Sequence, residues 1–176
     1  MFVNIWTAIT LILSALLMGA TLGHVLEMPG KLAASGPLWL TFQHTLYKAF
    51  AIAGGPIEMG AIGASAMLAW LVRRNRSLLP SVLSASALLA IGFGIWLAFT
   101  SPVNARTSAW VPGAMPADWD RWRTQWEYSH AARFLLHLIA FCILVLASIF
   151  RMPESPRKRL RPAYGPRVAH QEMAVR

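Results

Sequence analysis

The sequence has little of what a soluble or disulfide-stabilised protein needs. Only 13% of its 176 residues are charged and 56% are hydrophobic, whereas about a quarter of residues are charged in ordinary soluble domains. Its one cysteine, Cys142, excludes an intramolecular disulfide and provides no zinc-ribbon spacing. Acidic residues are also few, 7 against 16 Lys and Arg. This composition argues against an ordinary soluble domain and favours a membrane protein.

The basic residues gather in two patches, which argues against a nucleic-acid partner. Nine of the sixteen lie in residues 73–76 and 151–167. Clusters that flank hydrophobic segments follow the positive-inside rule. We therefore expect both patches, and with them both chain termini, on the cytoplasmic side of the membrane.

Four hydrophobic runs reach the roughly 20 residues that a membrane span requires. We predict an all-α, integral membrane four-helix bundle in residues 1–151, in contact with the lipid bilayer and located in a bacterial inner (plasma) membrane. The first run lacks a basic segment before it and is expected to be retained. Residues 152–176 are expected to form a basic, disordered cytoplasmic tail. The predicted spans are residues 3–25, 41–72, 78–100 and 124–150.

The last span begins with an unusual number of polar side chains, in "QWEYSHAARFLLHLIAFC" (residues 125–142). At 3.6 residues per turn these side chains share one helix face. Because ionisable groups in hydrocarbon are costly, this face should point into the bundle. We expect Glu127 to orient His130. The stripe consists of Trp126, Glu127, His130, Arg133 and His137.

Two other spans add polar residues. His24 and Glu27 end the first span, and the second carries His44, Tyr47 and Glu58. Pro56 should kink the second span, with Glu58 at the depth of His137. Glu27 and Lys31 are interpreted as solvated charges of a loop over residues 27–37.

Three chemistries are open to such a constellation. The first is a metal centre, with iron or copper as the expected ion and zinc as another choice; its ligands would come from His24, His44, Glu58, His130 and His137. The second is a haem held by two histidines. The third is acid–base catalysis without a metal. Alternatively, Arg133 serves only as a structural partner of Glu127 or Glu58.

The order of motifs resembles the anthrone oxygenase family of small four-span membrane proteins. The resemblance rests on "PVN" (residues 102–104), a Trp-rich loop, and W-E-x-x-H-x-x-R from Trp126 to Arg133. It implies oxidation of an anthrone methylene to a carbonyl by molecular oxygen. The residues it implies are Asn104, Trp126, His130 and Arg133.

We therefore expect a membrane-embedded, oxygenase-like oxidoreductase that acts on a small hydrophobic phenolic or quinol-type substrate. Its catalytic residues would be His130, Glu127, Arg133 and Asn104, and Trp126, Tyr47 and Trp110 would bind the substrate. The alternative is a non-catalytic haem- or quinone-binding redox subunit. A structural or assembly subunit is a third reading, and an oligomer is compatible with all three.

Overall fold

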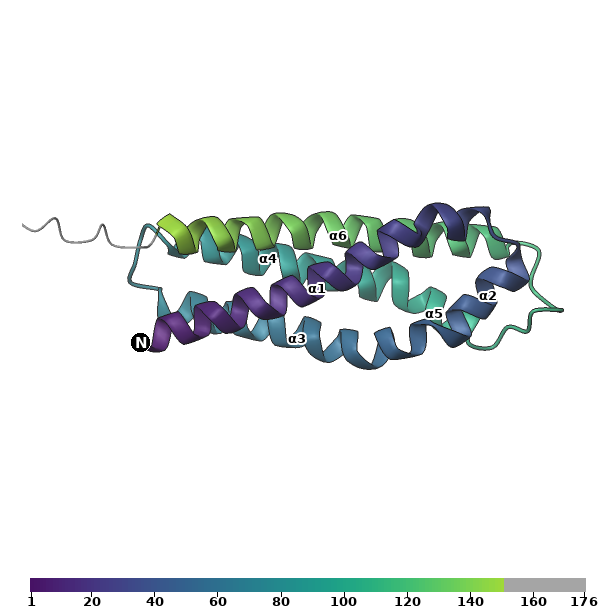
Figure 1. Ribbon diagram of the computed structural model, residues 1–176, viewed down its shortest axis with the longest axis horizontal. Coiled ribbons are helices and arrows are strands. Elements are labelled where there is room, and N and C mark those ends of the chain that lie inside the picture. Colours follow the sequence, from purple (N-terminus) through teal and green to yellow (C-terminus); the bar gives the residue numbers. More distant parts are fainter. Residues whose placement is uncertain (151–176) are drawn as a thin grey trace, which may run out of the picture.

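The chain forms an elongated helical bundle (Figure 1). The computed structural model describes residues 1–150, and all regular secondary structure in that range is helical. The all-α prediction is thus confirmed, whereas the predicted tail at 152–176 lies outside the described residues. The long helices are α1 (Phe2–Ala33), α3 (Tyr47–Leu71), α4 (Leu79–Ile95) and α6 (Trp119–Phe150).

Four helical segments are long and apolar enough to cross a membrane. They are α1, α3, the stretch Leu79–Thr107, and α6. Large hydrophobic side chains on their outer surfaces, such as Ile12, Leu97 and Ile139, are about half exposed. Hydrocarbon is the solvent that such surfaces prefer. Length, composition and surface together indicate a multi-pass membrane protein in contact with lipid.

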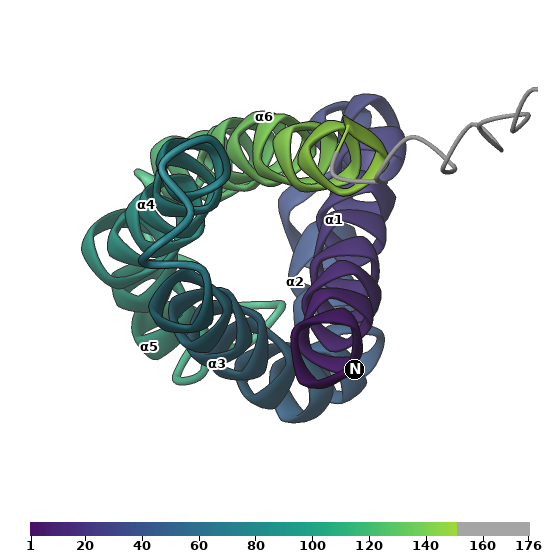
Figure 2. The same cartoon turned by 90° about the vertical axis from the view of Figure 1, so that its left-hand side faces the viewer.

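The four long helices form a ring when viewed along the bundle (Figure 2). α1 lies between α3 and α6, and α4 also contacts both of these helices. The N-terminus lies at one end of the bundle (Figure 1). At the opposite end, here called the α2 end, lie α2 (Gly36–Thr45) and α5 (Ser101–Thr107).

The first connection is shorter than predicted. α1 continues past Val25 to Ala33 with Pro29 inside the helix, so that only Ala34 and Ser35 separate it from α2. Membrane helices tolerate proline because neighbouring groups satisfy the freed backbone. The prediction of a loop over residues 27–37 is therefore wrong for most of its length, and Lys31 belongs to a helix face.

The second predicted span is divided at Leu46 into α2 and α3. Pro56 lies inside α3, which stays helical on both sides of it. His44 consequently belongs to α2, while Tyr47 begins α3. His44 and Glu58, which were expected on one span, therefore lie on separate helices.

The third span ends later than predicted. α4 passes through a π-helical segment, η1 (Trp96–Thr100), into α5, so that residues 101–107 are helical. π-helical segments often occur at functional sites. Here η1 brings Thr100 to α6, where its hydroxyl lies 2.8 Å from that of Ser129.

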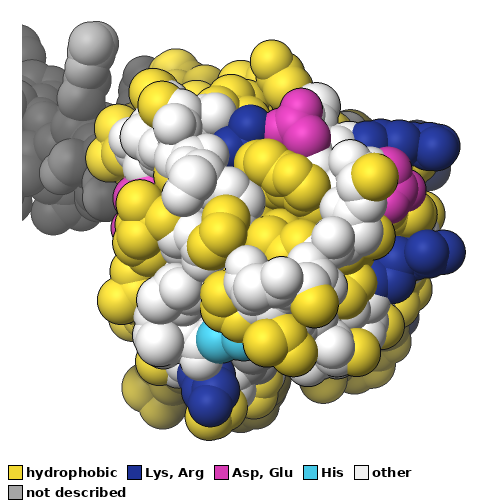
Figure 3. Space-filling view, turned by 90° about the vertical axis from the view of Figure 1, so that its right-hand side faces the viewer, with side chains coloured by type: hydrophobic (Ala, Val, Ile, Leu, Met, Phe, Trp, Pro, Cys, Tyr) yellow, Lys and Arg dark blue, Asp and Glu magenta, His cyan; other side chains and the backbone are white. Residues whose placement is uncertain are grey.

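The two ends of the bundle have different interiors. Toward the N-terminus the core is aliphatic, with Leu17, Leu68, Leu89 and Leu144 almost fully buried. Toward the α2 end the core is aromatic and is built from Trp39, Leu40, Tyr47, Val103 and Trp126. The surface of the α2 end is largely hydrophobic, with acidic and basic side chains near its margin (Figure 3).

Candidate functional site

The polar stripe of α6 points into the bundle, as predicted. Trp126, Glu127, His130, Arg133 and His137 are all at most 6% exposed. A stripe this polar cannot face lipid without a large cost. Side chains of α1, α2 and α3 meet it in three layers, numbered here from the α2 end.

The first layer is built around the Lys31 ammonium group. Lys31 is only 3% exposed, and its Nζ lies 2.9 Å from Oε2 of Glu127 and 3.8 Å from Oε2 of Glu27. The Trp39 indole donates a hydrogen bond of 3.2 Å to the other Glu127 oxygen. The Glu127 carboxylate therefore binds Lys31 and Trp39. We predicted that it would orient His130 instead. The interpretation of Lys31 as a solvated charge is wrong, because α1 extends to this depth.

The second layer contains two imidazoles in close contact, here called the histidine pair. The rings of His24 and His130 have centroids 4.0 Å apart and an interplanar angle of 31°. Trp126 lies against both, at 5.1 Å from His24 and 4.3 Å from His130. Tyr47 and Phe50 cover the remaining side of His24 at 4.9 and 5.0 Å. The pair is thus enclosed by aromatic rings.

Asn104 and Trp110 support this aromatic wall. The Trp126 indole donates a 2.8 Å hydrogen bond to Oδ1 of Asn104. This links two of the four residues that the family resemblance implies, even though Asn104 is otherwise exposed. Trp110 packs, partly buried, against the aromatic cluster that contains Trp126.

The third layer is a buried ion pair. Arg133 donates a hydrogen bond of 2.7 Å to Oε2 of Glu58, and both side chains are about 5% exposed. The second Glu58 oxygen lies 3.8 Å from Nε2 of His137. The predicted common depth of Glu58 and His137 is confirmed. Thr21 completes the layer, since its hydroxyl lies 3.4 Å from Nδ1 of His137.

Arg133 also indicates which nitrogen of His130 carries the proton. Its NH1 lies 3.4 Å from Nδ1 of His130. Because a guanidinium only donates hydrogen bonds, Nδ1 must accept, and a neutral His130 then carries its proton on Nε2. His24 differs, since its Nδ1 is buried with no hydrogen-bond partner among the described residues. This nitrogen of His24 therefore lies among the aromatic rings without a hydrogen bond from the described residues.

The five predicted metal ligands are not brought together. His44 lies on α2, where a ring nitrogen is 2.9 Å from the carbonyl oxygen of Thr107, and Glu58 is engaged by Arg133. The two rings of the histidine pair contact each other directly, with centroids 4.0 Å apart, whereas a metal requires ring nitrogens that converge on one point. Within residues 1–150 no three His, Cys, Asp or Glu residues are arranged to hold a metal ion. The residues present do not fit an iron or copper centre.

The haem hypothesis has no support from the histidine pair. A haem with two histidine ligands needs one imidazole on each face of the porphyrin. The rings of His24 and His130 lie 4.0 Å apart, which leaves no room for a macrocycle between them.

Several residues of the site were not predicted from the sequence, namely Lys31, Trp39, Phe50 and Thr21. A signal for Lys31 exists: Thr10, Ser14, Leu17, Thr21, His24 and Lys31 form the buried stripe of α1, at spacings of three, four and seven residues. Residues at such spacings share a helix face. The sequence offers no comparable signal for Trp39. It lies on the short helix α2, and the spacing of residues within that helix does not indicate which face points into the bundle.

Comparison with known proteins does not extend this description. No family model matches the chain, and searches of curated proteins and of solved structures return no significant match.

Proposed function

We propose that this protein is a membrane-embedded oxygenase-like oxidoreductase, which uses molecular oxygen to oxidise a lipid-soluble phenol of the anthrone or quinol type. One observation carries the proposal: in a buried histidine pair walled by aromatic rings, Nδ1 of His24 has no hydrogen-bond partner among the described residues. A flat aromatic substrate would stack against these walls. The free Nδ1 of His24 would serve as a general base.

The chemistry requires no bound metal. Nδ1 of His24 takes a proton from the methylene carbon of an anthrone, and the resulting anion passes electrons to O2 and forms a carbon–oxygen bond. The resulting peroxide anion is protonated to a hydroperoxide, which then loses water from its C–H and O–O bonds and leaves the carbonyl. Overall, the methylene compound and O2 give the carbonyl compound and one water. Nearby cations stabilise the anion, here Lys31 and Arg133, which lie in the layers on either side of the pair.

A bilayer orientation accompanies this proposal. Arg73, Arg74 and Arg76 are exposed between α3 and α4, at the end of the bundle opposite α2. By the positive-inside rule this end, with the N-terminus and the last turn of α6, faces the cytoplasm. The polar layers then lie in the extracytoplasmic half of a bacterial inner membrane. Labelling of single cysteines at Ser35 and Arg76 with a membrane-impermeant maleimide, in Cys142→Ser protein in whole cells, should modify only the first.

Oxygen consumption by detergent-purified protein tests the function, with 1,8-dihydroxyanthrone and duroquinol as substrates. His24→Gln should lower the rate by about 100-fold or more, as expected for loss of a general base. His44→Gln is the matched control, because His44 contacts a backbone carbonyl outside the pair, and it should keep the rate. Equal rates for both variants would overturn the proposal.

Two further outcomes separate the alternatives. A rate that survives chelator treatment supports the metal-free route, whereas a rate that is lost and then restored by iron or copper contradicts it. Saturable binding of the phenol or its quinone without oxygen consumption would replace the enzyme with a quinone-binding redox subunit.

A further inference from the structure

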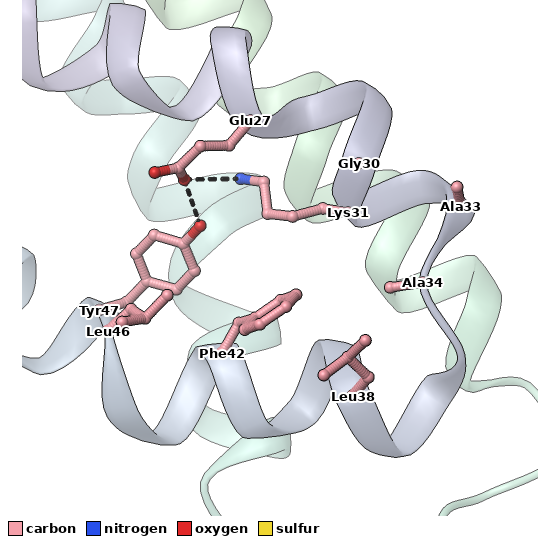
Figure 4. A pocket seen from close by; sticks show the side chains of 9 residues that line it. All are labelled: Glu27, Gly30, Lys31, Ala33, Ala34, Leu38, Phe42, Leu46 and Tyr47. Atoms are coloured by element: carbon pink, nitrogen blue, oxygen red, sulfur yellow. Dashed lines mark hydrogen bonds and ion pairs between the residues drawn. The ribbon is translucent and has the colours of Figure 1, made fainter.

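A pocket opens on the side of the bundle, between the last turns of α1 and the helix α2 (Figure 4). Its volume is about 430 Å³, within the range that holds a small organic ligand. Its walls include Leu38, Phe42 and Leu46. Leu38 and Leu46 are about half exposed. The pocket thus lies where lipid would reach it.

The inner end of the pocket is polar. Tyr47 donates a 2.5 Å hydrogen bond to Oε2 of Glu27, and Nζ of Lys31 lies 3.8 Å from the same oxygen. In Figure 4 the hydroxyl and the ammonium group both point at this carboxylate. An apolar body ending in one polar group is therefore the ligand shape that the pocket complements.

Tyr47 separates this pocket from the histidine pair. It lines the pocket, while its ring lies 4.9 Å from His24 and 5.2 Å from Trp126. It is also the first residue of α3, immediately after the division at Leu46. A small change of backbone angles at this junction would move the Tyr47 ring, which lies between the pocket and the histidine pair.

We infer that this pocket is the lateral admission site for the substrate, with the Tyr47–Glu27 hydrogen bond as its latch. The occupant is one lipid-soluble phenol taken from the bilayer; this inference rests on the proposed function. The phenol hydroxyl replaces that of Tyr47 at the Glu27 carboxylate, and its rings lie against Leu38 and Phe42. The exchange keeps the number of hydrogen bonds at Glu27 constant and frees Tyr47 to turn away from His24.

The test uses a phenol that carries a trifluoromethyl-diazirine group, photolysed with the protein in liposomes and mapped by mass spectrometry. Adducts should lie between residues 27 and 47. Gly30→Trp should reduce them at least tenfold, since Gly30 lines the pocket and a Cβ there meets nothing within 4 Å. Gly19→Trp is the matched control: Gly19 is also exposed on α1 with free space around it, but lies outside the pocket.

A second variant tests the latch, which is the hydrogen bond between Tyr47 and Glu27. Tyr47→Phe keeps the ring but removes the hydroxyl, so phenol labelling of residues 27–47 should rise because Glu27 no longer has an internal donor. Adducts mainly on α4 or α5, or labelling that Gly30→Trp and Gly19→Trp reduce equally, would overturn the inference. A fall in labelling in Tyr47→Phe would also overturn the latch.

The outcomes distinguish this inference from the proposed function. Labelling that Gly30→Trp abolishes, in a protein that consumes no oxygen, supports the pocket and contradicts the enzyme. Oxygen consumption that His24→Gln abolishes and Gly30→Trp leaves unchanged supports the enzyme and contradicts the pocket.

Discussion

The two halves of the bundle bury opposite kinds of side chain on the same helices. Near the N-terminus, α1, α3, α4 and α6 meet through residues such as Leu17, Ala61, Ala85 and Ala140. Toward the α2 end they surround two ion pairs and the histidine pair. Small and aliphatic residues suffice to hold membrane helices together. The polar half therefore carries more than packing requires, and this difference makes it the candidate functional site.

The largest effect should follow from Arg133→Met. This change leaves the buried Glu58 carboxylate without the cation that lies 2.7 Å away. Breaking a buried pair by removing one partner costs about 3–5 kcal/mol. The free energy of unfolding, measured by denaturant titration in mixed micelles, should fall by that amount.

The control for Arg133→Met is the double variant with Glu58→Gln, which also removes the stranded charge. It should regain most of the lost stability, because replacing both members of a buried pair is often nearly neutral. If the double variant is no more stable than Arg133→Met, the ion pair does not organise the third layer.

A substitution that lowers stability to a similar extent in the apolar half should leave the activity unchanged. Leu89 is fully buried in its core, and Leu89→Ala should lower the free energy of unfolding by about 2–5 kcal/mol. The rate of oxygen consumption per folded molecule should stay unchanged, because Leu89 belongs to the aliphatic core and not to the polar layers. Leu83→Ala on the same helix is the control, since Leu83 is half exposed. A lost rate in Leu89→Ala would remove the distinction between the halves.

Gly92 provides a sharper comparison at the boundary between the halves. A Cβ at Gly92 would lie 2.6 Å from Nε2 of His137, so Gly92→Ala must displace that ring and disturb Glu58. Overpacking of this kind costs about 1–3 kcal/mol. Gly94→Ala is the control, because a Cβ there meets nothing within 4 Å. Thermal unfolding should separate the two variants, and equal midpoints would show that His137 is free to move.

In the half toward the α2 end, the sequence predicts the positions of the buried polar side chains better than it predicts where the helices begin and end. The α6 stripe follows from helical spacing, and the common depth of Glu58 and His137 follows from helix length. Lys31 was missed because Pro29 and Gly30 are typical of a loop, whereas in a membrane helix the surrounding groups tolerate them. The division at Leu46 has no nearby glycine or proline in the sequence, so it follows from tertiary packing. The ring contact between His24 and His130 depends on the relative rotation of two helices, which periodicity within one helix does not specify.

The smallest effect should come from Asn104→Ala, and it decides how Asn104 acts. Asn104 accepts the 2.8 Å hydrogen bond of the Trp126 indole. Because Asn104 is exposed, water can replace it, and the free energy of unfolding should fall by only about 0.5–1.5 kcal/mol. In a Trp126→Phe background, where the donor is absent, the same substitution should change nothing further. If Asn104 instead stabilises an oxyanion, the oxygen-consumption rate should fall about 100-fold in both backgrounds. The structure favours the first result, since the side chain of Asn104 is already committed to orienting Trp126 beside the histidine pair.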